Sequence, residues 1–162
     1  MPVIESSVVV PVAPDVAYAV SQTTGDLRLR WDPFIGGQHF IDGAQRPDVG
    51  VRTFTRHRLG PSMVSEYVSY RPPSNVGMKM VSGPWFFDNF AGGWRFRPAD
   101  SPDGTPWTRA VWRYSFRIRP PWLSPVADRL GTLVLQREID RRIAAFARGC
   151  ADPVVLSAVA AT

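Results

Sequence analysis

Hydrophobic and polar residues alternate most regularly over residues 108–119, which read TRAVWRYSFRIR. Arg109, Arg113, Arg117 and Arg119 share one parity of this segment. Successive side chains of a strand point to opposite faces, so the pattern predicts a strand with a solvated arginine face and an apolar inner face. The predicted inner face consists of Ala110, Trp112, Tyr114, Phe116 and Ile118.

The chain before this segment predicts an opening strand, two short helices and further strands. The opening strand covers residues 3–12, and Pro14 and Asp15 then suit the first turn of a helix. A second short helix, DLRLRWD, ends before Pro33, and turn signals then separate about six more strands as far as residue 120. This order predicts an α+β fold with an antiparallel sheet of about seven strands.

A long closing helix is predicted from about Leu123 to Arg148. Its apolar stripe, which faces the sheet, consists of Leu135, Ile139, Ile143 and Phe146, with Thr132 and Gln136 beside it. Gly131 marks a kink or a close approach to the sheet, or is simply tolerated. A second apolar side, which would bury another surface, consists of Val126, Leu130, Leu133 and Val134. Residues 1–150 form one predicted domain, and residues 151–162 a loose tail.

Parity also predicts which side chains of the middle strands point inward. In the strand that ends at His57, Arg52, Arg56 and Arg58 take the solvent side. A turn around Gly60 and Pro61 then brings a mixed set of apolar and polar side chains to the inner face. This set consists of Val51, Thr53, Thr55 and His57 from the first strand and Val64, Glu66, Val68 and Tyr70 from the second. This register pairs Thr53 with Val68, Thr55 with Glu66 and His57 with Val64. A register shifted by one residue would instead turn Glu66 outward.

The predicted inner face mixes polar groups with large apolar side chains. Later strands add Val76, Met78, Met80, Phe90, Trp94 and Phe96. A dry core rarely holds threonines, an imidazole and a carboxylate among aromatic rings, because each unpartnered buried polar group costs a few kcal/mol. The mixture indicates a cavity of roughly 300 Å³ or more for a flat, apolar ligand. In the alternative interpretation, the histidine and the glutamate are hydrogen-bonded structural residues.

Charge and composition narrow the classes of partner. The net charge is +5, and Lys79 is the only lysine among 19 basic residues. The arginines are spread over alternating strand positions, which indicates a solvated sheet face. This spread and the absence of a recognised nucleic-acid-binding motif argue against nucleic acid as a partner. The single cysteine, Cys150, excludes an internal disulfide and fits the cytoplasm, and neither a secretory signal nor a membrane span is recognised.

Several short motifs, in this order and spacing, resemble the START/Bet v 1-like superfamily, in its polyketide cyclase/dehydrase branch. They are V-A-P-x-x-A-Y at 12–18, W-D-P at 31–33, D-V-G-V at 48–51, E-Y-V-S-Y-R-P-P at 66–73 and A-D-R-L-G at 127–131, the last preceded by W-R-Y-S-F. The resemblance implies a helix-grip fold, whose sheet wraps around the last helix and encloses a hydrophobic cavity. It implies no mandatory metal or cofactor, and a hydrophobic or aromatic small molecule as partner.

The candidate site combines ligand contacts with three polar side chains. His57 and Glu66 are candidates for acid and base, and Tyr114 for a hydrogen-bond donor. An inward amine is not expected, because Lys79 has solvent parity, and two histidines with one distant cysteine lack metal-ligand spacing. The predicted ligand contacts are Trp31, Thr53, Thr55, Met78, Met80, Phe90, Trp94, Trp112, Phe116, Leu135, Gln136 and Ile139.

Three functions fit these features. The first is a cofactor-independent cyclase or dehydratase that holds an aromatic or polyketide-like substrate in one folded geometry. The second is a non-catalytic binding or transfer protein for a lipid or another hydrophobic metabolite. The third is an interaction module with an arginine face. We expect a monomer or a homodimer in each case.

Overall fold

The computed structural model describes residues 1–120, 122 and 124–162. Pro121 and Leu123 lie outside the described residues, and with them the predicted start of the closing helix. The elements are, in chain order, β1 (Val3–Val10), α1 (Pro14–Ser21), α2 (Gly25–Trp31), β2 (Ile35–Phe40), β3 (Arg52–His57), β4 (Ser62–Arg71), β5 (Asn75–Ser82), β6 (Phe87–Ala99), β7 (Trp107–Ile118), α3 (Ser124–Gly149) and α4 (Pro153–Ala160).

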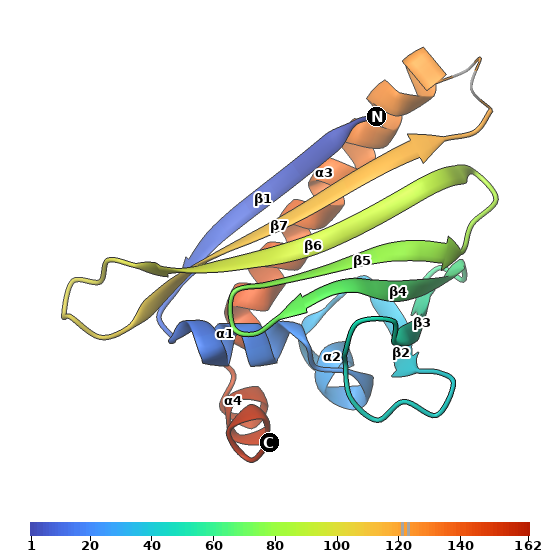
Figure 1. Ribbon diagram of the computed structural model, residues 1–162. Coiled ribbons are helices and arrows are strands. Elements are labelled where there is room, and N and C mark those ends of the chain that lie inside the picture. Colours follow the sequence, from blue (N-terminus) through green and yellow to red (C-terminus); the bar gives the residue numbers. More distant parts are fainter. Residues whose placement is uncertain (121, 123) are drawn as a thin grey trace.

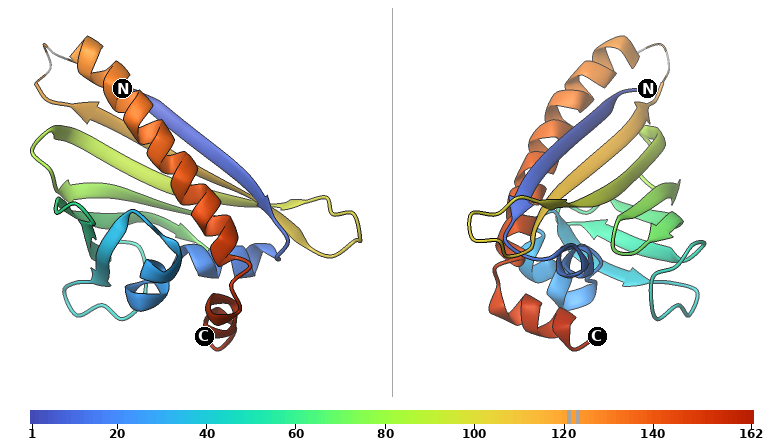
Figure 2. Two further views of the ribbon diagram at one scale, coloured as in Figure 1. Left: turned by 180° about the vertical axis from the view of Figure 1, so that it is seen from behind. Right: turned by 60° about the vertical axis from the view of Figure 1, so that its left-hand side comes forward.

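The strands form one seven-stranded sheet in the order β1-β7-β6-β5-β4-β3-β2. Neighbouring strands are antiparallel, and β1 returns to pair with β7. The sheet curls, and α3 crosses its concave side diagonally, with α1 and α2 at one end (Figures 1 and 2). This arrangement confirms the predicted α+β helix-grip fold.

Strand β7 follows the predicted alternation. Arg109, Arg113 and Arg117 are exposed, whereas the aromatic side chains between them are buried. The indole of Trp112 stacks on that of Trp94 from β6, with ring centroids 4.1 Å apart. Stacked and tilted aromatic rings bury large areas with defined geometry. This part of the sheet therefore forms a rigid inner wall.

The second half of α3 packs closely against that wall. Ile139 and Phe146 are fully buried, and the Phe146 ring lies 4.7 Å from Trp94 and 5.6 Å from Trp31 between centroids. Phe116 from β7 is also fully buried. A core at this density stabilises the domain by the apolar area that it removes from water. The hydrophobic stripe predicted for the closing helix is therefore the contact between α3 and the sheet.

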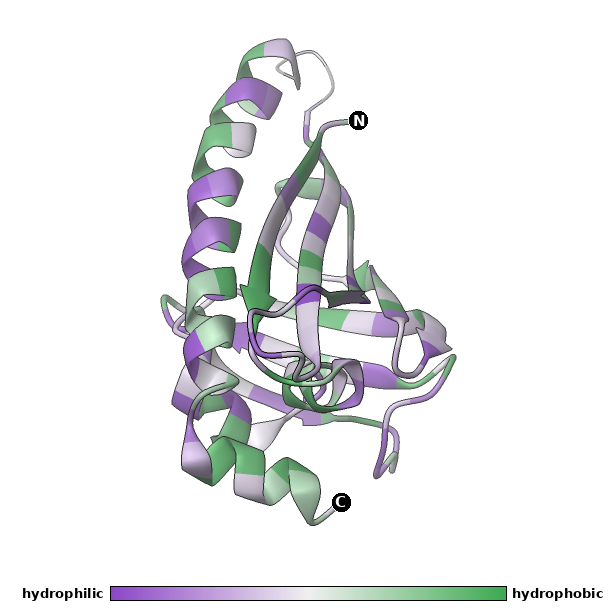
Figure 3. Ribbon diagram, turned by 90° about the vertical axis from the view of Figure 1, so that its left-hand side faces the viewer, coloured by the Kyte–Doolittle hydropathy of each residue, from purple (hydrophilic) through white to green (hydrophobic). Residues whose placement is uncertain are grey.

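Gly131 lies at a close approach of α3 to β7. A Cβ atom at this position would lie 2.6 Å from Ile118 Cδ1 and 3.2 Å from Phe116 Cε2. Of the alternatives predicted for this glycine, the structure thus favours a close approach. The second apolar side of the helix is exposed to solvent and does not bury another surface of the domain, in contrast to the prediction. It comprises Val126, Leu130, Leu133 and Val134. Figure 3 shows hydrophobic and hydrophilic bands alternating along α3.

The segment after residue 150 is not a loose tail, in contrast to the prediction. Residues Pro153–Ala160 form α4, and Asp152 caps it by accepting the Val154 N–H at 2.9 Å. Val155 is fully buried within the main hydrophobic core. Figure 3 shows α4 as largely hydrophobic. Helix formation and burial of this apolar face together hold the segment against the domain.

Among the described residues, no single helix is long and apolar enough to cross a membrane. Helices α3 and α4 pass that test of length and composition only as a pair, and they are bent by 73° at the break between them.

Candidate functional site

A cavity of about 400 Å³ lies between the concave side of the sheet, α2 and the middle of α3. Methionine and aromatic side chains from β4 to β7 form an apolar wall, and polar side chains from α1, α2, β2, β3 and α3 also border the cavity. The volume exceeds the predicted minimum and suits a drug-sized or smaller ligand. The predicted cavity is therefore present.

Ten of the side chains predicted for the site border this cavity. They are Thr53, Thr55, His57, Met78, Met80, Phe90, Trp94, Trp112, Tyr114 and Leu135. Each comes from a strand or helix face that the sequence pattern had turned inward. Their part in ligand binding stays a prediction.

Four predicted ligand contacts do not border the cavity. Phe116 and Ile139 are fully buried in the core. The Gln136 side chain points toward β1, where its Nε2 donates to the backbone oxygen of Glu5 at 3.0 Å. Trp31 borders a separate, open hollow of about 470 Å³ beside the end of α3. Helical and strand parity places a side chain on the inner side, but packing decides whether that position is core or cavity.

The register of the β3–β4 hairpin corrects the sequence-based pairing. The His57 N–H donates to the Pro61 oxygen at 2.8 Å, so the loop comprises residues 58–60 rather than a turn centred on Gly60 and Pro61. Gly60 has φ 114°, and a positive φ is typical of the last residue of a three-residue hairpin loop. The observed pairs are Thr53 with Ser65, Phe54 with Val64 and Thr55 with Met63. Because this shift is odd, the β4 side chains reverse their faces.

Glu66 consequently lies on the outer face of the sheet. Arg52 Nε donates to Glu66 Oε2 at 3.1 Å, and Lys79 Nζ lies 3.7 Å from Glu66 Oε1. The predicted Glu66–Thr55 pairing, and with it an acid–base pair of Glu66 and His57, is wrong. Lys79 points outward as predicted, since it is opposite Glu66 in the β4–β5 ladder.

His57 borders the cavity without a carboxylate partner. Its Nδ1 accepts the backbone N–H of Leu59 at 3.0 Å, and its ring meets the Phe34 ring edge-on, with centroids 4.2 Å apart. An acceptor Nδ1 leaves the proton of a neutral imidazole on Nε2. His57 is half-buried and Leu59 is exposed, which places the pair at the rim of the cavity.

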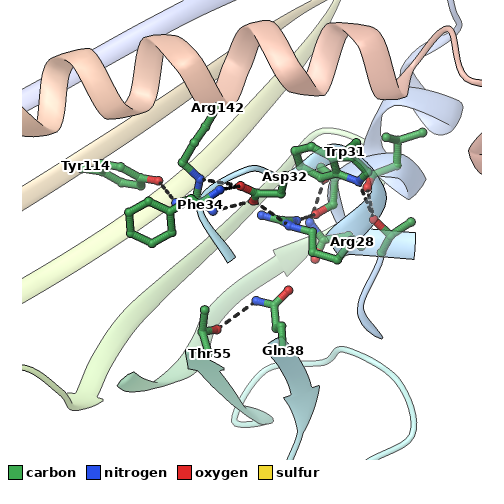
Figure 4. Close-up of polar contacts among 12 residues, drawn as sticks. Arg28, Trp31, Asp32, Phe34, Gln38, Thr55, Tyr114 and Arg142 are labelled. Atoms are coloured by element: carbon green, nitrogen blue, oxygen red, sulfur yellow. Dashed lines mark hydrogen bonds and ion pairs between the residues drawn. The ribbon is translucent and has the colours of Figure 1, made fainter. Parts of the chain in front are cut away.

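A buried charged cluster at the α2–α3 end of the cavity contains residues that the sequence analysis missed. Asp32, directly after α2, accepts Arg28 Nε at 2.9 Å, Arg142 Nε at 3.1 Å and Arg142 Nη2 at 2.7 Å. Arg142 Nη1 donates to the Tyr114 hydroxyl at 2.6 Å. Figure 4 shows these side chains converging beneath α3 from three elements. Arg28, Asp32 and Arg142 are 6%, 1% and 7% exposed, so water contributes little to their solvation.

Burial and mutual contact set the protonation of this cluster. Burial alone would raise the pKa of Asp32, but Arg142 and Arg28 outweigh it and hold the carboxyl pKa below its usual range. Burial lowers the pKa of Arg28, and Arg142 lowers it further, whereas Asp32 opposes both. Burial raises the pKa of Tyr114 to about 12, against the opposing effect of Arg142. At neutral pH, Tyr114 is therefore a neutral phenol and Asp32 a carboxylate.

Aromatic rings enclose both guanidinium groups. Arg142 Cζ lies 4.3 Å from the centroids of Phe34 and Trp112, and Arg28 Cζ lies 4.3 Å from that of Trp31. Rings at this distance attract cations through their π faces and exclude water. The cluster is therefore held in one geometry by packing as well as by hydrogen bonds.

Further polar atoms on the cavity wall are neutral. Gln38 Nε2 donates to Thr55 Oγ1 at 3.1 Å, and the Tyr67 hydroxyl donates to Gln22 Oε1 at 3.2 Å. Thr53 Oγ1 is buried and has no hydrogen-bond partner within the described part of the chain. An unpartnered hydroxyl beside a cavity can bond to a ligand, and burying it without a partner is otherwise costly.

Sequence signals for the charged cluster exist but are easily misread. Arg28 and Asp32 are four residues apart, the spacing of a helical ion pair, although Asp32 directly follows the helix. Arg142 lies three residues after Ile139 and four before Phe146, on the buried stripe of the closing helix. Surface exposure is the usual state of arginine, so the sequence alone does not mark either arginine as buried.

The arrangement can orient a polar group of an apolar ligand by hydrogen bonds from Arg28, Arg142 and Tyr114, which all border the cavity. In the part of the chain that the structure describes, no group of three His, Cys, Asp or Glu side chains is placed to hold a metal ion.

Comparison with known proteins gives one family and many similar folds. The model of the polyketide cyclase / dehydrase and lipid transport family matches residues 1–150. The protein XoxI from Bacillus cereus superposes with a TM-score of 0.74 at 11% identity, covering 94% of this chain and 97% of that one. A START superfamily protein from Mycobacterium smegmatis superposes with a TM-score of 0.65 at 12% identity, covering 86% and 95%.

A third similar structure is the di-domain ARO/CYC BexL from the BE-7585A biosynthetic pathway. It superposes with a TM-score of 0.68 at 13% identity, covering 92% of this chain and 46% of that one. No curated protein matches the chain.

Proposed function

The chain belongs to the polyketide cyclase / dehydrase and lipid transport family, and from this premise we propose that its cavity binds an aromatic or polyketide-like small molecule in one folded conformation. The observation that carries this proposal is the composition of the wall, in which methionine and aromatic side chains surround a few convergent polar groups. Such a surface desolvates an apolar ligand and fixes its orientation through the polar atoms.

A direct test uses N-phenylnaphthylamine, a neutral, flat and apolar fluorescent probe. Trp94 and Trp112 border the cavity, so bound probe should quench their fluorescence while its own emission rises. We expect Ser65→Phe, which adds bulk on the cavity side of β4, to raise the dissociation constant about tenfold or more. Val64→Phe adds the same bulk on the opposite face of β4 and serves as the control. Equal binding by the two variants and the parent would contradict the proposal.

Cyclase or dehydratase chemistry is the leading function for such a cavity, and Tyr114 is the group that supports it. Its hydroxyl accepts from Arg142 Nη1, which leaves the phenolic hydrogen free for a substrate carbonyl or hydroxyl oxygen. Arg142 beside it stabilises negative charge that develops on that oxygen. Holding the substrate in a reactive geometry supplies the rest of the rate enhancement.

The catalytic test follows loss of water from an aromatic β-hydroxy ketone by the absorbance of the conjugated enone. The parent should accelerate this reaction above the buffer rate, and Tyr114→Phe should slow it by ~100-fold or more while probe affinity stays within a few-fold. Equal rates with and without the parent would leave a non-catalytic carrier of a hydrophobic metabolite. The carrier alternative is favoured by one observation, the placement of Glu66 on the outer face, away from His57. Native mass spectrometry of the freshly purified protein would then identify the cargo.

A further inference from the structure

The charged cluster at the α2–α3 end of the cavity is not electrically balanced. It contains two guanidinium groups, of Arg28 and Arg142, and the single carboxylate of Asp32 lies between them. Asp32 also accepts the Phe34 N–H at 3.1 Å, so its oxygens are fully used. Since one carboxylate neutralises one guanidinium, the cluster retains one positive charge inside the protein.

Neighbouring groups do not supply the missing negative charge by direct contact. Glu138 borders the cavity one turn before Arg142, but among the described residues it forms no ion pair within 4.0 Å with either arginine. Tyr114 accepts from Arg142 as a neutral phenol. The aromatic rings around the guanidinium groups attract the cations but carry no net charge. A buried charge without a counter-ion is costly, and an anion brought to this site would relieve that cost.

The donors of the cluster are placed to receive such an anion. Arg28, Arg142 and Tyr114 all border the cavity. Arg28 uses Nε for Asp32 and Nη1 for the Ser21 oxygen at 2.7 Å, and its Nη2 makes no hydrogen bond to another described residue. The Tyr114 hydrogen likewise has no acceptor in the described part of the chain.

We propose that the cavity selects amphipathic anions: an apolar body with a single carboxylate or enolate group, held against Arg28, Arg142 and Tyr114. The apolar body lies along the methionine and aromatic wall, and the anionic oxygen accepts hydrogen bonds from the unused donors. This inference rests on the proposed binding function and specifies the class of ligand. A guanidinium beside a phenol suits a planar oxyanion, because both donate in fixed directions.

A matched pair of probes tests this selectivity. Anilinonaphthalene sulfonate and N-phenylnaphthylamine share one ring system, but only the first carries an anionic group. Arg28→Met removes the surplus charge and leaves the bidentate Asp32–Arg142 pair in place, so this variant keeps a balanced cluster. We expect it to raise the dissociation constant of the sulfonate about tenfold or more and to leave that of the neutral probe within about twofold.

Two further variants test the role of charge, one by increasing the charge of the cluster and one as a surface control. Asp32→Asn raises the charge of the cluster and should shift the ratio of the two dissociation constants toward the anion, with folding checked by circular dichroism. Arg137→Met removes an exposed arginine of the same helix as Arg142 and should leave both dissociation constants unchanged. If Arg28→Met loses affinity for both probes equally, Arg28 only shapes the cavity. If the ratio of the two dissociation constants is unchanged in all variants, the cluster does not select anions. Either result overturns the inference.

A measurement on the parent alone avoids dependence on the folding of any variant. Dodecanoate and dodecanol share one chain length, and the inference requires dodecanoate to displace N-phenylnaphthylamine at the lower concentration. The reverse order contradicts it. If the neutral probe does not bind the parent at all, the proposed binding function fails; if it binds but anions are not preferred, only the charge selectivity fails.

Discussion

Two polar regions border the same cavity, and they differ in how their geometry is fixed. The α2–α3 cluster is almost fully buried, and Asp32 joins Arg28 and Arg142 there through three charged hydrogen bonds. Three side chains that border the cavity from β2 and β3, those of Gln38, Thr55 and His57, are only half-buried, and among the described residues the His57 side chain bonds only to a loop N–H. The difference indicates that the cluster provides a preorganised anchor. The β2–β3 region provides an adaptable rim.

The largest predicted effect comes from removing the carboxylate of the buried α2–α3 cluster. Asp32→Asn leaves two buried guanidinium groups without a counter-ion, so we expect the free energy of unfolding to fall by ~3–5 kcal/mol. Urea denaturation followed by tryptophan fluorescence measures the change. Glu66→Gln is the matched control, because Glu66 pairs with Arg52 and Lys79 at the surface, where such pairs contribute about 0–1 kcal/mol. Similar losses in both variants would mean that burial of the Asp32 ion pairs adds nothing to their effect on stability.

Acid should remove the contribution of the Asp32 ion pairs to the stability of the parent protein. The pKa of Asp32 is lower in the folded protein than the ~3.9 of an unfolded chain. Its pairing therefore stabilises the fold above about pH 4 and is lost as the pH falls through the folded pKa. The free energy of unfolding of the parent should begin to approach that of Asp32→Asn as the pH falls below about 4. A gap that stays constant under acid would mean that the pairing of Asp32 does not shift its pKa.

A smaller effect separates charged from neutral hydrogen bonds on the cavity wall. Tyr114→Phe removes the acceptor of Arg142 Nη1 and leaves a charged donor unsatisfied, which should cost ~1.5–3 kcal/mol of stability. Tyr67→Phe removes a neutral bond to Gln22 from an equally buried tyrosine and should cost ~0.5–1.5 kcal/mol. Thermal unfolding of both variants compares them, and equal losses would mean that the charge of Arg142 adds nothing.

The elements of the fold were predictable where one face of an element is buried along its whole length. Strand β7 alternates without interruption, so the sequence pattern identified both of its faces correctly. Helix α4 was missed, although Asp152 and Pro153 together form a recognisable helix start. Its apolar side chains were interpreted as a tail because their contact, α1, lies far away in the sequence.

The site was less predictable because its decisive contacts are not local. Asp32 and Arg142 are separated by 110 positions, and their contact depends on how α3 crosses the sheet. The hairpin register was predicted incorrectly for a local reason: the loop comprises residues 58–60 instead of turning at Gly60 and Pro61, which moves the β4 register by three residues and changes which β4 side chains face the cavity. Parity therefore identified the apolar wall, whereas the polar chemistry required the tertiary structure.

The smallest predicted effect concerns the two residues that the sequence had paired, His57 and Glu66. They lie on opposite faces of the sheet and share no hydrogen-bond partner among the described residues. Stability changes at independent sites add within about 0.3–0.5 kcal/mol. In a double-mutant cycle of His57→Ala and Glu66→Gln, we therefore expect no coupling beyond that limit, either in the free energy of unfolding or in the affinity for N-phenylnaphthylamine. A coupling energy above ~1 kcal/mol would mean that the imidazole and the carboxylate do interact in solution. The rim of the cavity, rather than the buried cluster, would then be the better place to look for an acid and a base.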